Sequence, residues 1–202
     1  MKVKEQIIKS KKAVVIIPEI YGVNQYIKDW ANYFNHQGYD AFCVDFSSCS
    51  CSYLYSQSQE AYHDFMIEIG FDQYKAIEIY IGELRQHYKK IILFGSSVGA
   101  TIAWRLSDSP DCDGMIGYYG SRIRDYLEIS PICPCLLLFP EQEKSFVVSS
   151  IIPCLEQKDQ VEICVLPGKH GFADPYGRDF CEQSGKKALN RVGCFLRKIE
   201  QL

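Results

Sequence analysis

KIILFGSSVGATIAWRL, residues 90–106, is the stretch that decides the fold. Its first part is an apolar run typical of a buried strand, and its last part has apolar residues at helical spacing. A strand, a sharp turn and a helix form the context of a nucleophile elbow, in which a Gly-x-Ser-x-Gly pentad presents its serine at the apex. The glycines are needed because the turn is strained and the neighbouring backbone leaves no room for a Cβ. Ser97 is therefore the candidate nucleophile.

The overall composition is that of a globular protein with one core. The chain has 202 residues, 47% hydrophobic and 23% charged, and we predict a single domain over residues 1–202. No apolar run approaches the ~18 residues of a membrane span, and residues 1–12 lack the apolar core of a secretion signal. The sequence predicts a cytoplasmic protein without membrane contact, and it leaves a monomer and a small homo-oligomer open.

Charge and cysteine spacing argue against nucleic-acid binding and against a metal site. The formal net charge is -3, and basic residues are interspersed with acidic ones, so no basic surface for phosphate is expected. Ten cysteines are unusual, but neither Cys49 and Cys51 nor Cys133 and Cys135 have Cys-x-x-Cys spacing. In a chain this rich in core residues we predict reduced cysteines that fill the core, with no metal or other cofactor.

Apolar runs alternate with segments of helical period along the chain. Residues 13–17 form a β-branched run, as expected for a strand buried on both faces. Asn24 is placed to cap a helix that stops near Gly38. The alternation predicts an α/β fold with a mostly parallel sheet covered by helices on both faces. The expected strands are 13–17, 39–44, 91–94, 114–119, 135–139 and 161–166, the expected helices are 24–37, 72–88, 98–106, 145–158 and 181–199, and 47–58 is expected to be a loop.

A serine hydroxyl needs a base, and histidine suits this task because its pKa lies near neutrality. His36 and His87 fall at the C-terminal ends of expected helices, where the helix dipole favours a cation. His63 falls on an expected short helix. His170 follows the strand that ends near Leu166, in the kind of loop where open α/β sheets bind their ligands. We therefore predict His170 as the base.

The histidine needs an acid that fixes its tautomer, and in this kind of fold the chain order is serine, acid, histidine. The acid should lie between the other two residues and just beyond a strand. Residues 135–139 supply the strand, and residues 140–143 supply the turn after it. We predict Glu143 as the acid, ahead of Glu141 and Asp159, and the choice between the two glutamates stays open.

The segment Pro18-Glu19-Ile20-Tyr21-Gly22-Val23-Asn24 closely resembles the Gln-Glu-Ile-Phe-Gly-Val-Asn of the dienelactone hydrolase family. The likeness covers about residues 13–200 and includes Gly38-Tyr39, Asp45, the elbow, Gly117-Tyr118-Tyr119-Gly120 and Lys169-His170-Gly171-Phe172. It implies an α/β-hydrolase fold and an enzyme that cleaves esters or lactones through a covalent acyl-enzyme. Because the first expected strand begins at residue 13, we expect a sheet trimmed at its N-terminal side.

The resemblance also implies roles for three residues near the elbow. The backbone N–H groups of Ile20 and Val98 would form the oxyanion hole. Glu19 is similar to the buried glutamate that contacts the nucleophile of the family's enzymes in the resting state. The alternative for Glu19 is an ordinary loop carboxylate.

The chain departs from the family in three respects. Ser97 stands where the founding enzymes carry cysteine, and dependence on His170 should be stronger because a hydroxyl is less acidic than a thiol. The acid follows Pro140-x-x-Glu143, where members generally have Gly-x-x-Asp. Two arginines that bind the carboxylate of dienelactone correspond here to Ser58 and Asp174, so dienelactone itself is not the expected substrate.

The combined prediction is a serine hydrolase for a small, uncharged ester or lactone, with Ser97, Glu143 and His170 as its triad. Aromatic residues near the loops are predicted to line its pocket unless they only fill the core: Tyr21, Tyr62, Phe146 and Phe172. Two other functions stay open. One is a ligand-binding protein that has lost turnover, and the other is an acyltransferase that passes the acyl group to an amine or alcohol. The sequence does not decide whether the loop 47–58 closes over the pocket.

Overall fold

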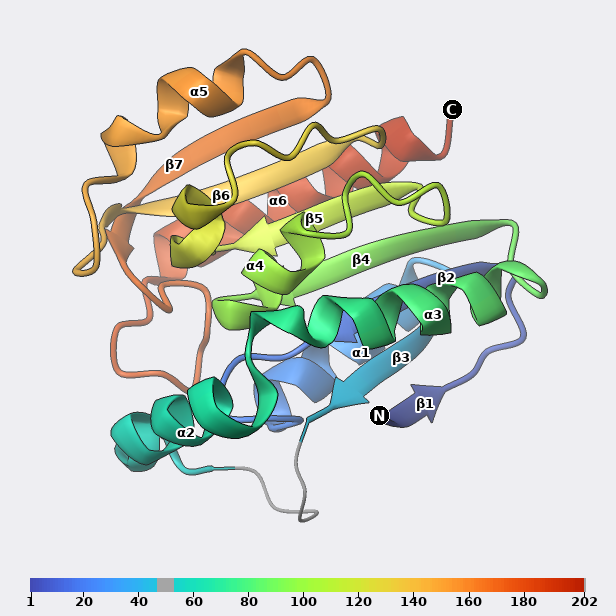
Figure 1. The fold of residues 1–202 in the computed structure, drawn as a ribbon, viewed down its shortest axis with the longest axis horizontal. Helices are drawn as coiled ribbons and strands as arrows, with labels where there is room; N and C mark the ends of the chain where they lie inside the picture. Colours follow the sequence, from blue (N-terminus) through green and yellow to red (C-terminus); the bar gives the residue numbers. More distant parts are fainter. Residues whose placement is uncertain (47–52, 202) are drawn as a thin grey trace.

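A computed structural model describes residues 1–46 and 53–201 and shows one sheet with helices on both faces (Figure 1). In the described residues the strand order is β1-β3-β2-β4-β5-β6-β7, and only β1 runs antiparallel to its neighbour. This confirms the predicted α/β fold with a mostly parallel sheet. The strands are β1 (Lys2–Gln6), β2 (Lys12–Ile17), β3 (Asp40–Asp45), β4 (Lys90–Ser96), β5 (Gly114–Tyr118), β6 (Cys135–Gln142) and β7 (Val161–Lys169).

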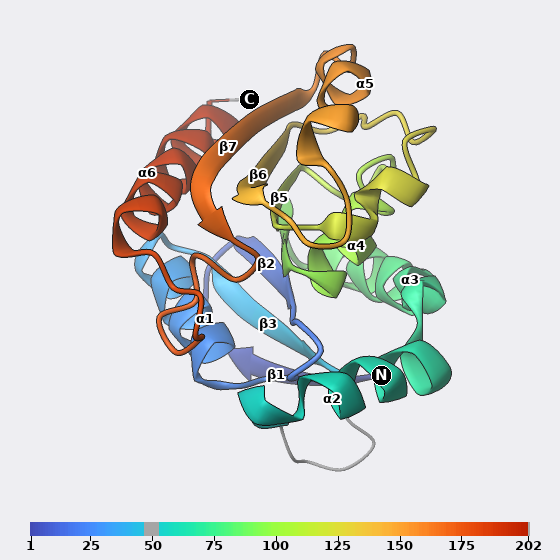
Figure 2. The ribbon, with the colours of Figure 1, turned by 90° about the vertical axis from the view of Figure 1, so that its left-hand side faces the viewer.

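The two faces of the sheet carry different helices, as the edge-on view shows (Figure 2). On one face, α1 (Gln25–His36) and α6 (Glu182–Ile199) bury their apolar sides against the strands. On the other face lie α3 (Tyr74–Arg85), α4 (Val98–Trp104) and α5 (Ile152–Glu156). The central strands β2, β4 and β5 are buried almost throughout, because helices cover them on both sides.

Shorter helical segments complete the chain. They are α2 (Ser58–Asp64), a π-helical turn at Phe65–Ile69 and 3₁₀ turns at Tyr55–Gln57, Phe71–Gln73, Ser121–Asp125 and Val148–Ser150. The side chain of Asn24 accepts the N–H of Ile27 at 3.1 Å, which confirms the predicted N-cap of α1. No helix in the described part of the chain is both long and apolar enough to cross a membrane.

Four details of the predicted secondary structure are wrong. The sheet begins at residue 2 and not at 13, because β1 is a charged edge strand with one apolar residue, which leaves no readable alternation. Strands β6 and β7 each run three residues beyond their predicted ends. The helix expected at 145–158 is reduced to a 3₁₀ turn and the short α5, which has a proline in its first turn. The predicted loop 47–58 contains a 3₁₀ turn in its described part, whereas residues 47–52 lie outside the described residues.

Candidate active site

Ser97 occupies the sharp turn between β4 and α4, with backbone angles φ 53° and ψ -118°. A residue other than glycine in such a conformation costs ~1–3 kcal/mol, so the surrounding structure must hold it. One restraint is the hydrogen bond from the Ser97 N–H to the Tyr118 carbonyl at 2.9 Å. A Cβ on Gly95 would lie 2.3 Å from the Gly99 carbonyl oxygen, and one on Gly99 would lie 2.1 Å from the Ile17 carbonyl oxygen. The close backbone approach predicted at both glycines is confirmed.

Three side chains from distant parts of the chain meet beside the C-terminal ends of the strands. Ser97 Oγ lies 2.9 Å from His170 Nε2, and His170 Nδ1 lies 2.6 Å from Glu143 Oε2. Glu143 follows β6 and His170 follows β7, so two neighbouring strands deliver them to the same place. The N–H and hydroxyl of Ser145 also donate to Glu143, at 3.3 and 3.1 Å. Glu141 is exposed, so of the two candidate glutamates the structure brings Glu143 to the histidine.

The pairing with Glu143 fixes the hydrogen-bonding roles of the histidine. An ionised carboxylate only accepts hydrogen bonds, so His170 donates from Nδ1 and its Nε2 accepts the Ser97 hydroxyl. Burial disfavours the charge on Glu143, but the hydrogen bond and charge of His170 hold the pKa of Glu143 below its usual value. Burial also lowers the pKa of His170, but the Glu143 carboxylate outweighs it and raises that pKa above 6.5. This arrangement stabilises an imidazolium next to Ser97.

A second chain of polar groups lies behind the histidine. The Tyr119 hydroxyl donates to Glu19 Oε1 at 3.1 Å and is also 3.1 Å from the Tyr26 hydroxyl. The Tyr119 ring lies 4.9 Å from the His170 ring, centroid to centroid. Burial raises the pKa of Glu19 to about 7, so this carboxyl is partly protonated at neutral pH. Glu19 is thus a buried carboxyl bonded to Tyr119, and its contact with the nucleophile, which the resemblance implied, stays a prediction.

Sequence reasoning gave Tyr119 no role of its own. In the sequence, Tyr119 stands out only as one of residues 117–120, which resemble the corresponding segment of the family. Its backbone φ of 42° marks Tyr119 as one of the few non-glycine residues with positive φ in the described part of the chain, a property invisible in the sequence. The N–H of Tyr119 donates to the Leu138 carbonyl at 2.7 Å, which ties this residue to β6.

The two backbone N–H groups predicted to form the oxyanion hole lie just after β2 and β4, which are neighbouring strands. Val98 is the first residue of α4, directly after Ser97, and Ile20 is in the turn that follows β2. Among the turns and loops of the described residues, neither N–H donates to a backbone carbonyl. Both groups are therefore free of the backbone partners that would prevent them from binding an oxyanion.

A cavity of about 360 Å³ opens beside His170. Tyr21 and Tyr55 line it with their rings 4.7 Å apart, and Ser58 borders it as well. Asp174, which is 2% exposed, accepts the Tyr55 hydroxyl at 2.6 Å. Burial raises the pKa of Asp174 against the opposing effect of that hydrogen bond. The cavity thus places a carboxyl group where an anionic substrate would need a cation.

Of the four aromatic residues predicted to line the pocket, only Tyr21 borders this cavity. Phe172 is 0% exposed and packs between other rings of the core, so it cannot touch a substrate. Tyr62 is exposed, and its hydroxyl accepts a hydrogen bond from the Arg122 guanidinium. Phe146 packs under the Arg124 guanidinium and borders a different cavity. A loop has no periodicity, so the sequence could not show which way these side chains point.

The remaining histidines and the cysteines lie away from this centre. His36 is in the last turn of α1 and bonds the Asn32 carbonyl, and His63 is an exposed residue at the end of α2. The cysteines of the described residues are unpaired, and several fill the core as predicted: Cys43, Cys112, Cys133 and Cys135. Cys194 is exposed, so the prediction is wrong there, and residues 49 and 51 lie outside the described part. No group of three or more potential metal ligands occurs among the described residues.

Comparisons with known proteins show which family and which fold this chain is similar to. The sequence profile of the dienelactone hydrolase family matches residues 2–200. The uncharacterized protein YczH of Bacillus subtilis is 38% identical, over 82% of each chain. The dienelactone hydrolase-like promiscuous phosphotriesterase P91, from metagenomic libraries, has a TM-score of 0.74 at 13% identity and covers 94% of this chain and 87% of its own. The butyrate-bound esterase Est2 of Thermogutta terrifontis has a TM-score of 0.67 at 14% identity, over 98% and 88%. At such identities the two structures show a shared fold.

Proposed function

We propose a nucleophile, a triad and a substrate class for this chain, which belongs to the dienelactone hydrolase family and is a carboxylic ester hydrolase. The proposed enzyme cleaves small uncharged carboxylic esters or lactones through an acyl-enzyme on Ser97. The observation that carries this proposal is the unbroken path of hydrogen bonds from Ser97 Oγ through both nitrogens of His170 to Glu143.

In the proposed mechanism Ser97 Oγ attacks the ester carbonyl while His170 Nε2 takes the hydroxyl proton. Glu143 holds the opposite nitrogen in its protonated form and stabilises the imidazolium as it forms. The backbone N–H groups of Ile20 and Val98 donate hydrogen bonds to the developing oxyanion, and one such donor is typically worth ~3 kcal/mol. His170 then gives its proton to the leaving alcohol, and a water activated by the same nitrogen releases the acid and restores Ser97.

The substrate class is inferred from the charges of the cavity beside His170. Asp174 faces this cavity, and the only arginine among its described lining residues, Arg178, has a side chain that is 84% exposed and pairs with Asp179 at 3.4 Å. A substrate carboxylate would meet like charge there without a buried cation to bind it. We therefore expect uncharged esters to be turned over in preference to carboxylated ones.

The nucleophile is tested with a nitrophenyl ester and a phosphonate label located by peptide mass. We expect a single adduct on Ser97 and loss of turnover in Ser97→Ala, with normal turnover in the control Ser150→Ala, which changes an exposed serine. An adduct on another serine, or full turnover by Ser97→Ala, would refute the triad. Saturable binding without a burst of nitrophenol would instead indicate a ligand-binding protein, and acyl products formed with added amines or alcohols would indicate an acyltransferase.

The substrate class is tested with p-nitrophenyl butyrate and mono-p-nitrophenyl succinate, in which a carboxylate replaces the terminal methyl group. We expect kcat/KM to be lower for the succinate by ~10-fold or more, because like-charge contacts cost up to several kcal/mol. Asp174→Asn should reduce the ratio of kcat/KM for the neutral ester to kcat/KM for the succinate. The control Asp108→Asn removes the same charge from an exposed site and should leave the ratio unchanged. An equal reduction of this ratio in both variants would show that the net charge of the protein, and not Asp174, sets the preference for the uncharged ester.

A further inference from the structure

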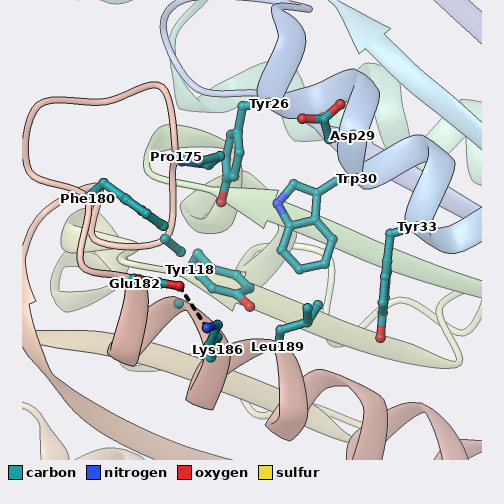
Figure 3. A pocket seen from close by; sticks show the side chains of 12 residues that line it. Tyr26, Asp29, Trp30, Tyr33, Tyr118, Pro175, Phe180, Glu182, Lys186 and Leu189 are labelled. Carbon is teal, nitrogen blue, oxygen red and sulfur yellow. Dashed lines mark ion pairs between the residues drawn. The ribbon is translucent and has the colours of Figure 1, made fainter.

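A second cavity, of about 430 Å³, lies between α1 and α6 and shares no lining residue with the cavity beside His170 (Figure 3). Its volume is in the range of small-molecule sites. We propose that it binds an uncharged, ring-sized aromatic molecule. The proposed occupant follows from the walls of the cavity and from the state of the charged groups around it.

The walls are aromatic and come from three separate parts of the chain. Tyr26 and Trp30 project from α1, Phe180 comes from the loop before α6, and Tyr118 stands at the end of β5 (Figure 3). The Trp30 ring is fixed by contacts with other rings, among them Tyr118 at 5.4 Å between centroids. A wall that is held in place before binding favours flat apolar ligands, because little side-chain freedom is lost.

Part of this apolar surface is left uncovered. Phe180 and Leu189 face the cavity and are each 41% exposed. Tyr118, by contrast, is 1% exposed, so the cavity reaches from an open rim to a buried floor. This shape suits a small molecule inserted edge-on, which would cover both exposed side chains.

The charged groups at the rim already have partners. Glu182 pairs with Lys186 at 2.7 Å. Asp29 accepts hydrogen bonds from the Gln25 side-chain amide at 2.8 Å and from the Tyr176 hydroxyl at 2.6 Å. A charged ligand would lose its water and gain no unpaired partner, so the arrangement selects against both anions and cations.

Two hydroxyl groups of the lining, those of Tyr33 and Tyr118, remain available for orientation, and Tyr33 lies nearer the open rim because Tyr118 is 1% exposed. Neither hydroxyl has a hydrogen-bond partner within the described residues, and Figure 3 places the Tyr33 side chain across the cavity from Phe180. A ligand with a single hydrogen-bonding group at one end of its ring would fit this pattern. The expected class is therefore a benzene-sized ring carrying one neutral polar substituent, such as an amide.

Tryptophan fluorescence can report on this cavity directly. The chain has two tryptophans, and Trp104 is fully buried among the residues of the other face, where it donates to the Tyr126 carbonyl. In Trp104→Phe, Trp30 is the only tryptophan. Titration with benzamide, benzoate and benzylammonium, excited where these probes do not absorb, should give a saturable change with benzamide and at least ten-fold weaker binding of the two ions.

Variants identify the site. Leu189→Glu changes a half-exposed residue, so the fold should be kept, and it should weaken benzamide binding at least ten-fold; the matched control Ile79→Glu, on exposed α3 surface, should not. Binding should persist after the phosphonate label has blocked Ser97, which separates this site from the proposed active site. If Trp30 does not respond, or responds equally to benzoate, the proposal is wrong. Self-association that Leu189→Glu abolishes would identify a second copy as the occupant and overturn it as well.

Discussion

Replacing Glu143 by glutamine keeps the shape of the side chain and removes its charge. The change acts on the 2.6 Å contact with His170 Nδ1, the shortest hydrogen bond of the proposed triad. A hydrogen bond to a charged group is worth ~1.5–3 kcal/mol net, which corresponds to about 10- to 150-fold in rate. A glutamine can also turn its amide toward Nδ1 and favour the wrong tautomer, an effect that reaches ~10⁴ in a serine protease. We therefore expect kcat to fall by ~10- to 10⁴-fold.

The same variant should shift the pH dependence of kcat/KM, whose acid limb reports the base in the free enzyme. Activity requires neutral His170, so it is present above the pKa of this residue and lost as the pH falls through it. Because Glu143 raises that pKa above 6.5 and burial lowers it, the midpoint should lie above 6.5 in the native protein and move to lower pH in Glu143→Gln. Burst kinetics with a nitrophenyl ester from pH 5 to 9 would measure both quantities.

Glu141→Gln is the matched control, because Glu141 is an exposed glutamate two residues before the proposed acid. It should leave kcat and the acid limb unchanged. Native kcat in Glu143→Gln with an unmoved acid limb, or an equal loss in both variants, would show that Glu143 does not orient the base.

Three further predictions concern the framework of the site, and each is measured by urea unfolding. Gly99→Ala should destabilise the fold by more than ~3 kcal/mol, because its Cβ would lie 2.1 Å from the Ile17 carbonyl oxygen, whereas Gly82→Ala in α3 should stabilise it by ~0.5–1 kcal/mol; equal stability of the two would contradict the close approach. Burial raises the pKa of Glu19 from 4.5 to about 7, so stability present below pH 4.5 should be lost by ~3 kcal/mol as the pH rises through 7, and Glu19→Gln should flatten that slope; a slope that is unchanged in the variant would assign it to other groups. Tyr119→Phe removes the hydroxyl that donates to Glu19 and should cost ~1–3 kcal/mol, and a neutral result would mean that water replaces it.

The acid of the triad shows where reading the sequence stops. Residues two apart on a strand point to the same side, so periodicity cannot distinguish Glu141 from Glu143. The structure does so because β6 continues to Gln142 with a shift in its pairing to β7, and because Ser145 donates to the carboxylate of the later glutamate. Both features depend on how the end of this strand is paired and turned.

The lining of the cavities shows the same limit. Phe172 is two residues from His170 and yet lies wholly in the core, because Gly171, with a φ of 85°, redirects the chain between them. Tyr55 and Tyr119, which contact the carboxyls near His170, gave no separate signal in the sequence. Their roles come from elements that meet only in the folded molecule.

By itself the sequence determined the elbow, the order of the strands from β2 onward and of the long helices between them, and the candidates Ser97 and His170. These follow from local rules: which residues fit a strained turn, which runs are apolar enough to be buried on both sides, and which loops follow a strand. Only the tertiary structure decided which carboxylate reaches the imidazole, which rings line each cavity, and that a charged edge strand joins the sheet. Those outcomes depend on contacts between segments far apart in the chain, and such contacts leave no periodic trace in the order of residues.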